Sequence, residues 1–148
     1  MNTIQPDLKS LTSFQVCGFQ VRTKNTDEFN PETAKLPTLW QQFSTSDLAQ
    51  DASIFGVYSD YESDANGLYT VTAGIASNTI KPELGSITIQ PGKYLVFKNR
   101  GPMPFAVIEA WKQVWHYFST EPNYQRNFRS DFEAYLGSDE IAIHIGVD

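Results

Sequence analysis

An internal repeat constrains the fold of this chain more than any other feature of its sequence. Trp40-Gln41-Gln42-Phe43-Ser44-Thr45 matches Trp115-His116-Tyr117-Phe118-Ser119-Thr120 at four of six positions. Further along, Phe55-Gly56-Val57-Tyr58 lines up with Phe132-Glu133-Ala134-Tyr135, at a distance from Trp to Phe of 15 residues in the first copy and 17 in the second. Two matches in the same order indicate a duplicated structural unit.

The hydrophobic patterns predict the same succession of elements in both copies. In the first copy they predict a strand over 10–24 with a bulge or bend at Gly18, a polar loop over 24–31, a helix over 32–48 that starts near Pro37, and strands over 53–61 and 68–76. In the second copy they predict a strand over 86–98 interrupted at Pro91-Gly92, a helix over 105–119, a polar loop over 121–130, and strands over 131–136 and 140–147.

The predicted order is therefore β-α-β-β, a connector, and β-α-β-β again. The first half-repeat covers about 10–76, the connector 77–85 and the second half-repeat about 86–148. At 148 residues the chain is predicted to form a single domain, 1–148, with one core.

Glu133 stands out within this repeat. In the strand predicted over 131–136, Glu133 and Tyr135 lie on one face, and Phe132 and Ala134 lie on the other. Glu133 occupies the position that Gly56 holds in the first copy, so the architecture does not require a carboxylate there. The carboxylate is either a solvated edge residue or a buried charge that serves a ligand.

Composition narrows the choice of partner. Aromatic residues make up 14% of the chain, with ten Phe, seven Tyr and three Trp, which suits either a cavity for an apolar ligand or a Phe-rich core. The net charge is −6 and the eleven Lys and Arg are scattered, which argues against nucleic acid. A negative field favours cationic small molecules.

Several other classes of site are excluded or unsupported. The single cysteine, Cys17, excludes an internal disulfide framework and a multi-cysteine metal site. No spacing of His, Asp or Glu indicates a metal, and no nucleophile and base occur in a catalytic pattern. We therefore expect no cofactor. The N-terminus lacks a signal-peptide pattern and no apolar run reaches membrane-spanning length, so we expect a cytoplasmic protein that does not enter membranes.

A series of short motifs resembles the GyrI-like effector-binding domains. The series is Pro91-Gly92-Lys93-Tyr94, Gly101-Pro102, Ala110-Trp111 on a helix, and Asp131-Phe132-Glu133 followed by a terminal Ile/Val strand. Such domains are ligand modules of bacterial transcription activators, including multidrug-responsive ones, and also stand alone, for example as integron cassette proteins. The resemblance covers about residue 10 to the end, and its specificity lies in the order of the motifs.

The resemblance implies an α+β fold of tandem β-α-β-β units around a pseudo-two-fold axis. It also implies an antiparallel sheet, two main helices and an aromatic pocket between the halves. In multidrug-responsive members a buried glutamate neutralises the positive charge of lipophilic cations, and that glutamate matches Glu133. Aromatic wall positions carry over to Phe55, Tyr58, Phe105 and Trp111. Tyr135 is added because it shares the strand face of Glu133.

Three functions follow as hypotheses. The first is a non-catalytic protein that binds hydrophobic, cationic small molecules through Glu133. The second is a hydrolase of strained electrophilic compounds, in which Glu133 would orient or deprotonate water. The third is a protein-interaction module that resembles gyrase inhibitors. Unlike the regulators, the chain has no residues left over for a helix-turn-helix, so we expect no direct DNA binding. Whether it acts with a separate DNA-binding protein or another protein partner stays an open question at this point.

Overall fold

A computed structural model of the chain describes residues 6–47, 54–63, 67–76, 84–120, 124–137 and 139–148. The elements, in chain order, are β1 (Asp7–Leu11), β2 (Phe14–Thr23), α1 (Asn25–Glu28), α2 (Leu36–Ser44), β3 (Ile54–Ser59), β4 (Tyr69–Ala76), β5 (Gly85–Ile89), β6 (Gly92–Arg100), α3 (Phe105–Ser119), β7 (Arg126–Tyr135) and β8 (Glu140–Val147). Most of the predicted connector, 77–83, lies outside the described residues, as does the middle of the turn between β3 and β4.

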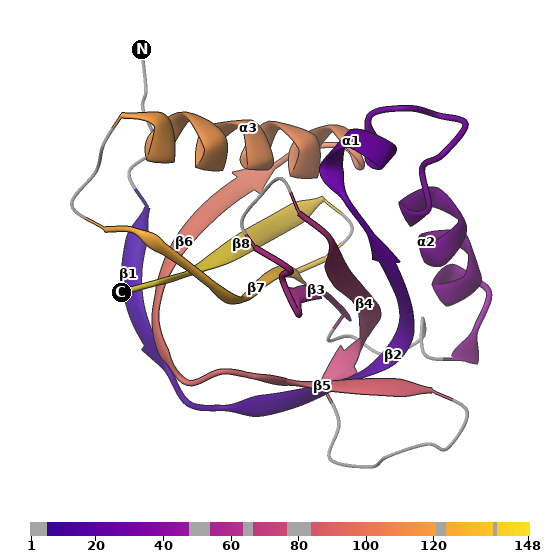
Figure 1. The fold of residues 1–148 in the computed structure, drawn as a ribbon, viewed down its shortest axis with the longest axis horizontal. Helices are drawn as coiled ribbons and strands as arrows, with labels where there is room; N and C mark the ends of the chain where they lie inside the picture. Colours follow the sequence, from indigo (N-terminus) through magenta and orange to yellow (C-terminus); the bar gives the residue numbers. More distant parts are fainter. Residues whose placement is uncertain (1–5, 48–53, 64–66, 77–83, 121–123, 138) are drawn as a thin grey trace.

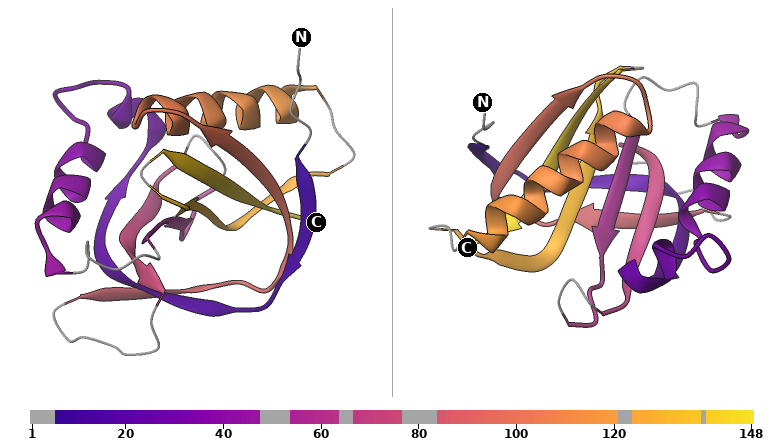
Figure 2. Two further views of the ribbon diagram at one scale, coloured as in Figure 1. Left: turned by 180° about the vertical axis from the view of Figure 1, so that it is seen from behind. Right: turned by 90° about the horizontal axis from the view of Figure 1, so that it is seen from above.

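The strands form one antiparallel sheet in the order β1-β6-β8-β7-β3-β4-β2-β5. The sheet is strongly curled, and α2 and α3 pack against it as the two main helices (Figures 1 and 2). The predicted α+β class, the duplicated β-α-β-β unit and the antiparallel sheet are thereby confirmed.

The two units are related by a pseudo-two-fold axis at the centre of the sheet. There β3 pairs with β7, and Gly56 lies directly opposite Glu133. These are the two positions that the sequence repeat aligned, so the axis passes through this residue pair. The outer strands obey the same symmetry. Strand β1, which precedes the first unit, pairs with β6 of the second unit, and β5, which precedes the second unit, pairs with β2 of the first.

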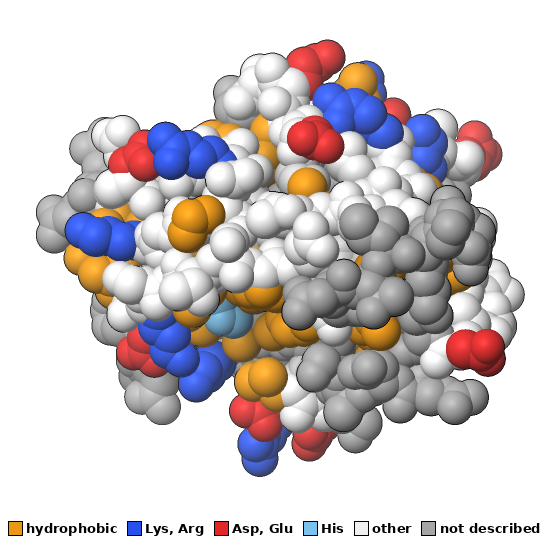
Figure 3. All heavy atoms as spheres, turned by 90° about the horizontal axis from the view of Figure 1, so that it is seen from below, with side chains coloured by type: hydrophobic (Ala, Val, Ile, Leu, Met, Phe, Trp, Pro, Cys, Tyr) orange, Lys and Arg blue, Asp and Glu red, His pale blue; other side chains and the backbone are white. Residues whose placement is uncertain are grey.

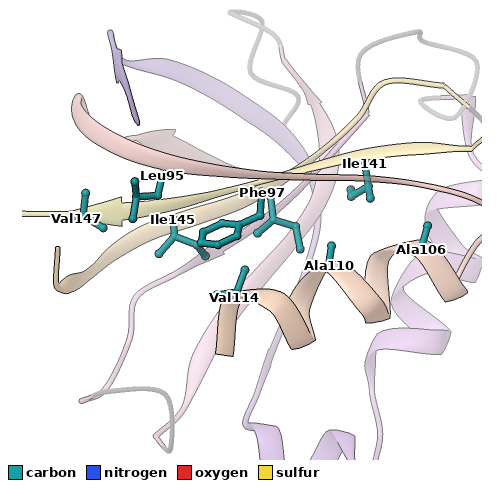
Figure 4. Close-up of a cluster of buried hydrophobic side chains, with 9 residues drawn as sticks. Leu95, Phe97, Ala106, Ala110, Val114, Ile141, Ile145 and Val147 are labelled. Carbon is teal, nitrogen blue, oxygen red and sulfur yellow. The ribbon is translucent and has the colours of Figure 1, made fainter. Parts of the chain in front are cut away.

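Three clusters of buried side chains hold the layers together. One lies between α3 and strands β6 and β8, where Ala106, Ala110 and Val114 meet Phe97 and Ile145 (Figure 4). A second joins α2 to β4 through Leu39, Phe43 and neighbouring side chains. The third lies on the opposite face of the sheet. The central strands are therefore covered on both faces.

Several predicted boundaries were wrong. The strand over 10–24 is two strands, because the chain breaks between β1 and β2 and each part pairs with a different neighbour. The polar loop over 24–31 contains the single turn α1, and α2 is shorter than predicted. The pairing of β2 with β4 is unbroken across Gly18, so there is no bulge at that residue. The polar loop over 121–130 already belongs to β7 from Arg126 onward.

The surface carries no continuous basic stripe on the face that Figure 3 displays. Lys and Arg side chains there lie in several small groups, most of them beside an Asp or Glu. Among the described residues, no helix is both long and apolar enough to cross a bilayer.

Gly18 allows β2 and β4 to approach each other closely, and its replacement tests that packing. A Cβ at Gly18 would lie 2.1 Å from the carbonyl oxygen of Ala73, which belongs to the backbone and cannot move aside cheaply. We expect Gly18→Ala to lower the free energy of unfolding by about 3 kcal/mol, measured by urea denaturation. Gln20→Ala, on the same strand but exposed, serves as the control and should cost at most about 1 kcal/mol. Equal stability of Gly18→Ala and the wild type would contradict this packing.

Candidate functional site

A cavity of about 690 Å³ lies between α2 and α3, over the centre of the sheet. Strands β3 and β7 form its floor, and residues of α1 contribute to its wall. All three tryptophans of the chain, Trp40, Trp111 and Trp115, line it. Its position at the junction of the two units is the one that the resemblance to GyrI-like domains implied.

Glu133 lies on the floor of this cavity and is buried, with 3% of its surface exposed. Its Oε2 accepts hydrogen bonds from the indole Nε1 of Trp111 at 2.6 Å and from the hydroxyl of Tyr58 at 2.9 Å. Its Oε1 accepts a hydrogen bond from the hydroxyl of Tyr135 at 2.8 Å. Among the described residues, no Lys, Arg or His forms an ion pair with it.

These surroundings have opposing effects on the ionisation of Glu133. Burial raises the pKa of the carboxyl group, and the hydrogen bonds from Trp111, Tyr135 and Tyr58 oppose that rise. Burial, together with the charge of Glu133, raises the pKa of Tyr58 and of Tyr135 well above the ordinary range. Both tyrosines therefore keep their protons and remain donors to the carboxylate.

The aromatic groups around Glu133 follow the pseudo-two-fold axis. Tyr58 and Tyr135 are equivalent in the repeat and donate to different oxygens of the one carboxylate. Trp111 packs edge-on against Tyr58 at 5.2 Å between ring centroids, and Trp40 packs edge-on against Tyr135 at 5.4 Å. By these contacts the structural counterpart of Trp40 is Trp111. The sequence repeat aligned Trp40 with Trp115, one helical turn away.

Gly56 provides the space that the carboxylate occupies. A Cβ at Gly56 would lie 2.8 Å from Oε1 of Glu133 and 2.8 Å from the indole ring of Trp40. A side chain at this position would therefore displace Glu133, Trp40 or both.

The structure brings four of the six predicted site residues to the cavity and leaves two outside it. Glu133, Trp111, Tyr58 and Tyr135 line it. Phe55 is one residue away from Gly56 on β3 and so points to the opposite face of the sheet, where its ring packs 5.5 Å from Phe14 and 5.9 Å from Phe132. Phe105 begins α3 and is 61% exposed at the surface.

Other cavity residues were missed or undervalued by the sequence analysis. Trp40 served only as a marker of the repeat, although a tryptophan repeated in both units could have suggested a shared wall. Tyr61 and Tyr69 also line the cavity, but they belong to a turn and a strand with no recognised motif. Arg126 was assigned to a loop, and its approach to the cavity depends on a bulge that sequence periodicity does not reveal.

This arrangement suits binding of a cation. An ionised carboxylate in an apolar site lacks solvation that a bound positive charge would restore, and aromatic faces attract the same charge. Within the described residues no group of three or more His, Cys, Asp or Glu could hold a metal ion.

Comparison with known proteins finds similar chains. The family model described as the integron-associated effector-binding protein, Cass2, matches residues 7–147. The Bacillus subtilis (strain 168) protein YobU, named as a candidate transcriptional regulator, is 32% identical over 129 residues, which are 80% of this chain and 78% of YobU.

Two solved structures share the fold. The Vibrio cholerae integron cassette protein VCH_CASS2 superposes with a TM-score of 0.88 at 35% identity, over 97% of this chain and 96% of its own. SAV2435, solved with bound tetraphenylphosphonium, superposes with a TM-score of 0.77 at 21% identity, over 98% of this chain and 94% of its own.

Replacing Glu133 by glutamine should change how stability depends on pH. Because the pKa of Glu133 is raised above its ordinary value of 4.5, the folded wild type binds this proton more tightly than the unfolded chain does. The stabilisation that this proton contributes to the folded wild type is therefore lost as the pH rises through the raised pKa. In the ligand-free protein we expect Glu133→Gln to raise the melting temperature by several degrees at pH 8, and this gain should vanish as the pH falls toward 4.5.

The glutamine can satisfy the same three partners. Its oxygen can accept from Trp111 and Tyr58, and its amide can donate to the hydroxyl of Tyr135. Thermal unfolding followed by circular dichroism between pH 4 and pH 8 measures the effect. A melting-temperature difference that stays the same across this range would contradict the raised pKa.

Proposed function

The chain belongs to the Cass2 family of integron-associated effector-binding proteins, and we propose that it is a non-catalytic receptor for lipophilic monovalent cations. The observation that carries the proposal is the buried carboxylate of Glu133, which lies on the floor of an aromatic cavity without a cationic partner among the described residues. The positive charge that would complete the site must come from the ligand.

The three donors to Glu133 support a role in binding. Hydrogen bonds from Trp111, Tyr58 and Tyr135 favour the ionised carboxylate and so oppose the rise in its pKa that burial causes, and a bound cation would favour the ionised form further. Attraction between a cation and ring faces contributes about 0.5–2 kcal/mol and is only loosely directional. Such a cavity would accept flat or propeller-shaped cations of several types, and the ligand tetraphenylphosphonium of the structurally similar SAV2435 belongs to this chemical class.

The role of the charge can be tested with two ligands of nearly equal shape. Methyltriphenylphosphonium is a cation, and triphenylphosphine oxide is its neutral counterpart. We expect the wild type to bind the cation at least about tenfold more tightly than the oxide. In Glu133→Gln this preference should be lost, because the carboxylate that answers the charge is gone. Quenching of tryptophan fluorescence measures both affinities, since all three tryptophans line the cavity.

Glu109→Gln is the matched control for this experiment. Glu109 lies on α3, pairs with Lys112 and does not line the cavity. Its replacement removes one negative charge from the protein but should leave the preference for the cation within about twofold of the wild type, because Glu109 lies outside the cavity and its partly exposed charge is screened. Equal preference for the cation in the wild type and in Glu133→Gln would contradict the proposal.

The aromatic residues divide into two groups that binding experiments can separate. Trp111→Phe removes the indole N–H that donates a hydrogen bond to Glu133 and should weaken binding of methyltriphenylphosphonium by about tenfold. Phe105→Ala, at an exposed position on the same helix outside the cavity, should change the affinity by less than about twofold. Isothermal titration calorimetry of both variants measures the difference. A loss in Phe105→Ala as large as that in Trp111→Phe would argue against the cavity as the binding site.

A further inference from the structure

Strand β7 carries a second buried carboxylate, two residues before Glu133. Asp131 is completely buried and is fully engaged with the protein. Its Oδ2 accepts from the Nη2 of Arg126 at 2.7 Å and from the hydroxyl of Tyr61 at 2.5 Å. Its Oδ1 accepts from the backbone N–H of Gly146 at 2.9 Å. Because residues two apart share a strand face, Asp131 and Glu133 point to the same side of the sheet.

A bulge in β7 brings Arg126 to Asp131. The strand pairs with β8 at Arg126 and again at Asp131, with a register shift between them. Phe128, inside the bulge, has a φ of 53°, and its ring lies 4.4 Å from the guanidinium carbon of Arg126. Only 10% of the Arg126 side chain is exposed, and the residue lines the cavity. Arg126 therefore stands between Asp131 and the space that a ligand would occupy.

The charged residues of the cavity wall differ in how they are compensated. Glu28 accepts hydrogen bonds from the backbone N–H groups of Lys35 and Leu36 at the start of α2, where the helix favours negative charge. Lys112 is mostly exposed and pairs with Glu109. With Asp131 neutralised by Arg126, Glu133 is the one carboxylate of the described cavity wall that lacks a cationic or helix-terminal partner.

We propose that Arg126 determines the charge selectivity of the cavity. By neutralising Asp131, it removes the negative charge that would attract the second charge of a dication, and so favours monocations over dications. The separation of the two carboxylates along β7 is about 7 Å between Cα atoms, the rise of two strand residues. This inference rests on the proposed binding of cations at Glu133. It goes further by stating that dications bind more weakly than monocations.

Ethidium and propidium form a suitable pair of probes. Both contain the same phenanthridinium cation, and propidium adds a quaternary ammonium group on a short propyl arm. We expect the wild type to bind ethidium about tenfold more tightly than propidium. In Arg126→Gln, Asp131 loses its cationic partner but keeps its hydrogen bonds from Tyr61 and Gly146. The ratio of the two affinities should then shift by about tenfold or more toward propidium.

The double variant Arg126→Gln, Asp131→Asn controls for shape. It opens the same space as Arg126→Gln but leaves no second carboxylate, so its preference should return to that of the wild type. Asp131→Asn alone keeps Arg126 unpaired and should weaken binding of both dyes. Dye fluorescence measures the affinities, and circular dichroism of each variant confirms that it is folded.

The outcomes separate this inference from the function on which it rests. A wild type that fails to bind ethidium would overturn the proposed function and the selectivity with it. Wild-type binding of ethidium with an unchanged affinity ratio in Arg126→Gln would overturn the selectivity alone. If Arg126→Gln does not fold, the Asp131→Asn variant still tests the proposed selectivity. In that variant Arg126 has lost its partner, so its positive charge should repel both dyes. Undiminished binding of both dyes would show that this charge does not affect the ligand and would overturn the selectivity.

Discussion

The buried carboxylate of Glu133 is the constraint on which the rest of the site depends. Removing an ionised carboxylate from water costs several kcal/mol unless hydrogen bonds or an opposite charge replace the lost solvation. Here Tyr58 comes from the first unit, and Trp111 and Tyr135 come from the second. The carboxylate therefore keeps its three donors only if β3 of the first unit and β7 of the second are paired in the correct register. The junction between the two units is also the floor of the cavity.

Symmetry explains why this residue occurs once. A two-fold axis through the Gly56–Glu133 pair leaves room for one side chain at the centre, because a Cβ on Gly56 would already collide with the carboxylate. The surrounding aromatics stay paired across the axis, Tyr58 with Tyr135 and Trp40 with Trp111. These two aromatic pairs are therefore symmetrical, and the symmetry is broken at the central position, where two side chains cannot coexist.

The two buried carboxylates of β7 have different surroundings, which match a structural role for Asp131 and the proposed ligand-binding role of Glu133. Asp131 receives a guanidinium, a hydroxyl and a backbone N–H, and in doing so fixes the bulge against β8. Glu133 receives three uncharged donors, which oppose but do not cancel the rise in its pKa that burial causes. Breaking a buried ion pair is costly because it leaves one charge uncompensated, so the Arg126–Asp131 pair belongs to the framework. Glu133 has no such counter-charge among the described residues, and this difference is the basis of its proposed role.

The sequence by itself determined the repeat, the order of the elements and the alignment of Glu133 with Gly56, because side-chain periodicity and local motifs are properties of neighbouring residues. It also placed Glu133 and Tyr135 on one strand face. The repeat also implied that Phe55, like Phe132, lies on the face opposite Glu133, which the structure bears out. Tertiary structure alone decided that Trp40 corresponds to Trp111 and that Arg126 reaches Asp131. These outcomes depend on the rotation of each helix over the sheet and on a bulge in β7. Each of them is fixed by contacts between residues far apart in the chain.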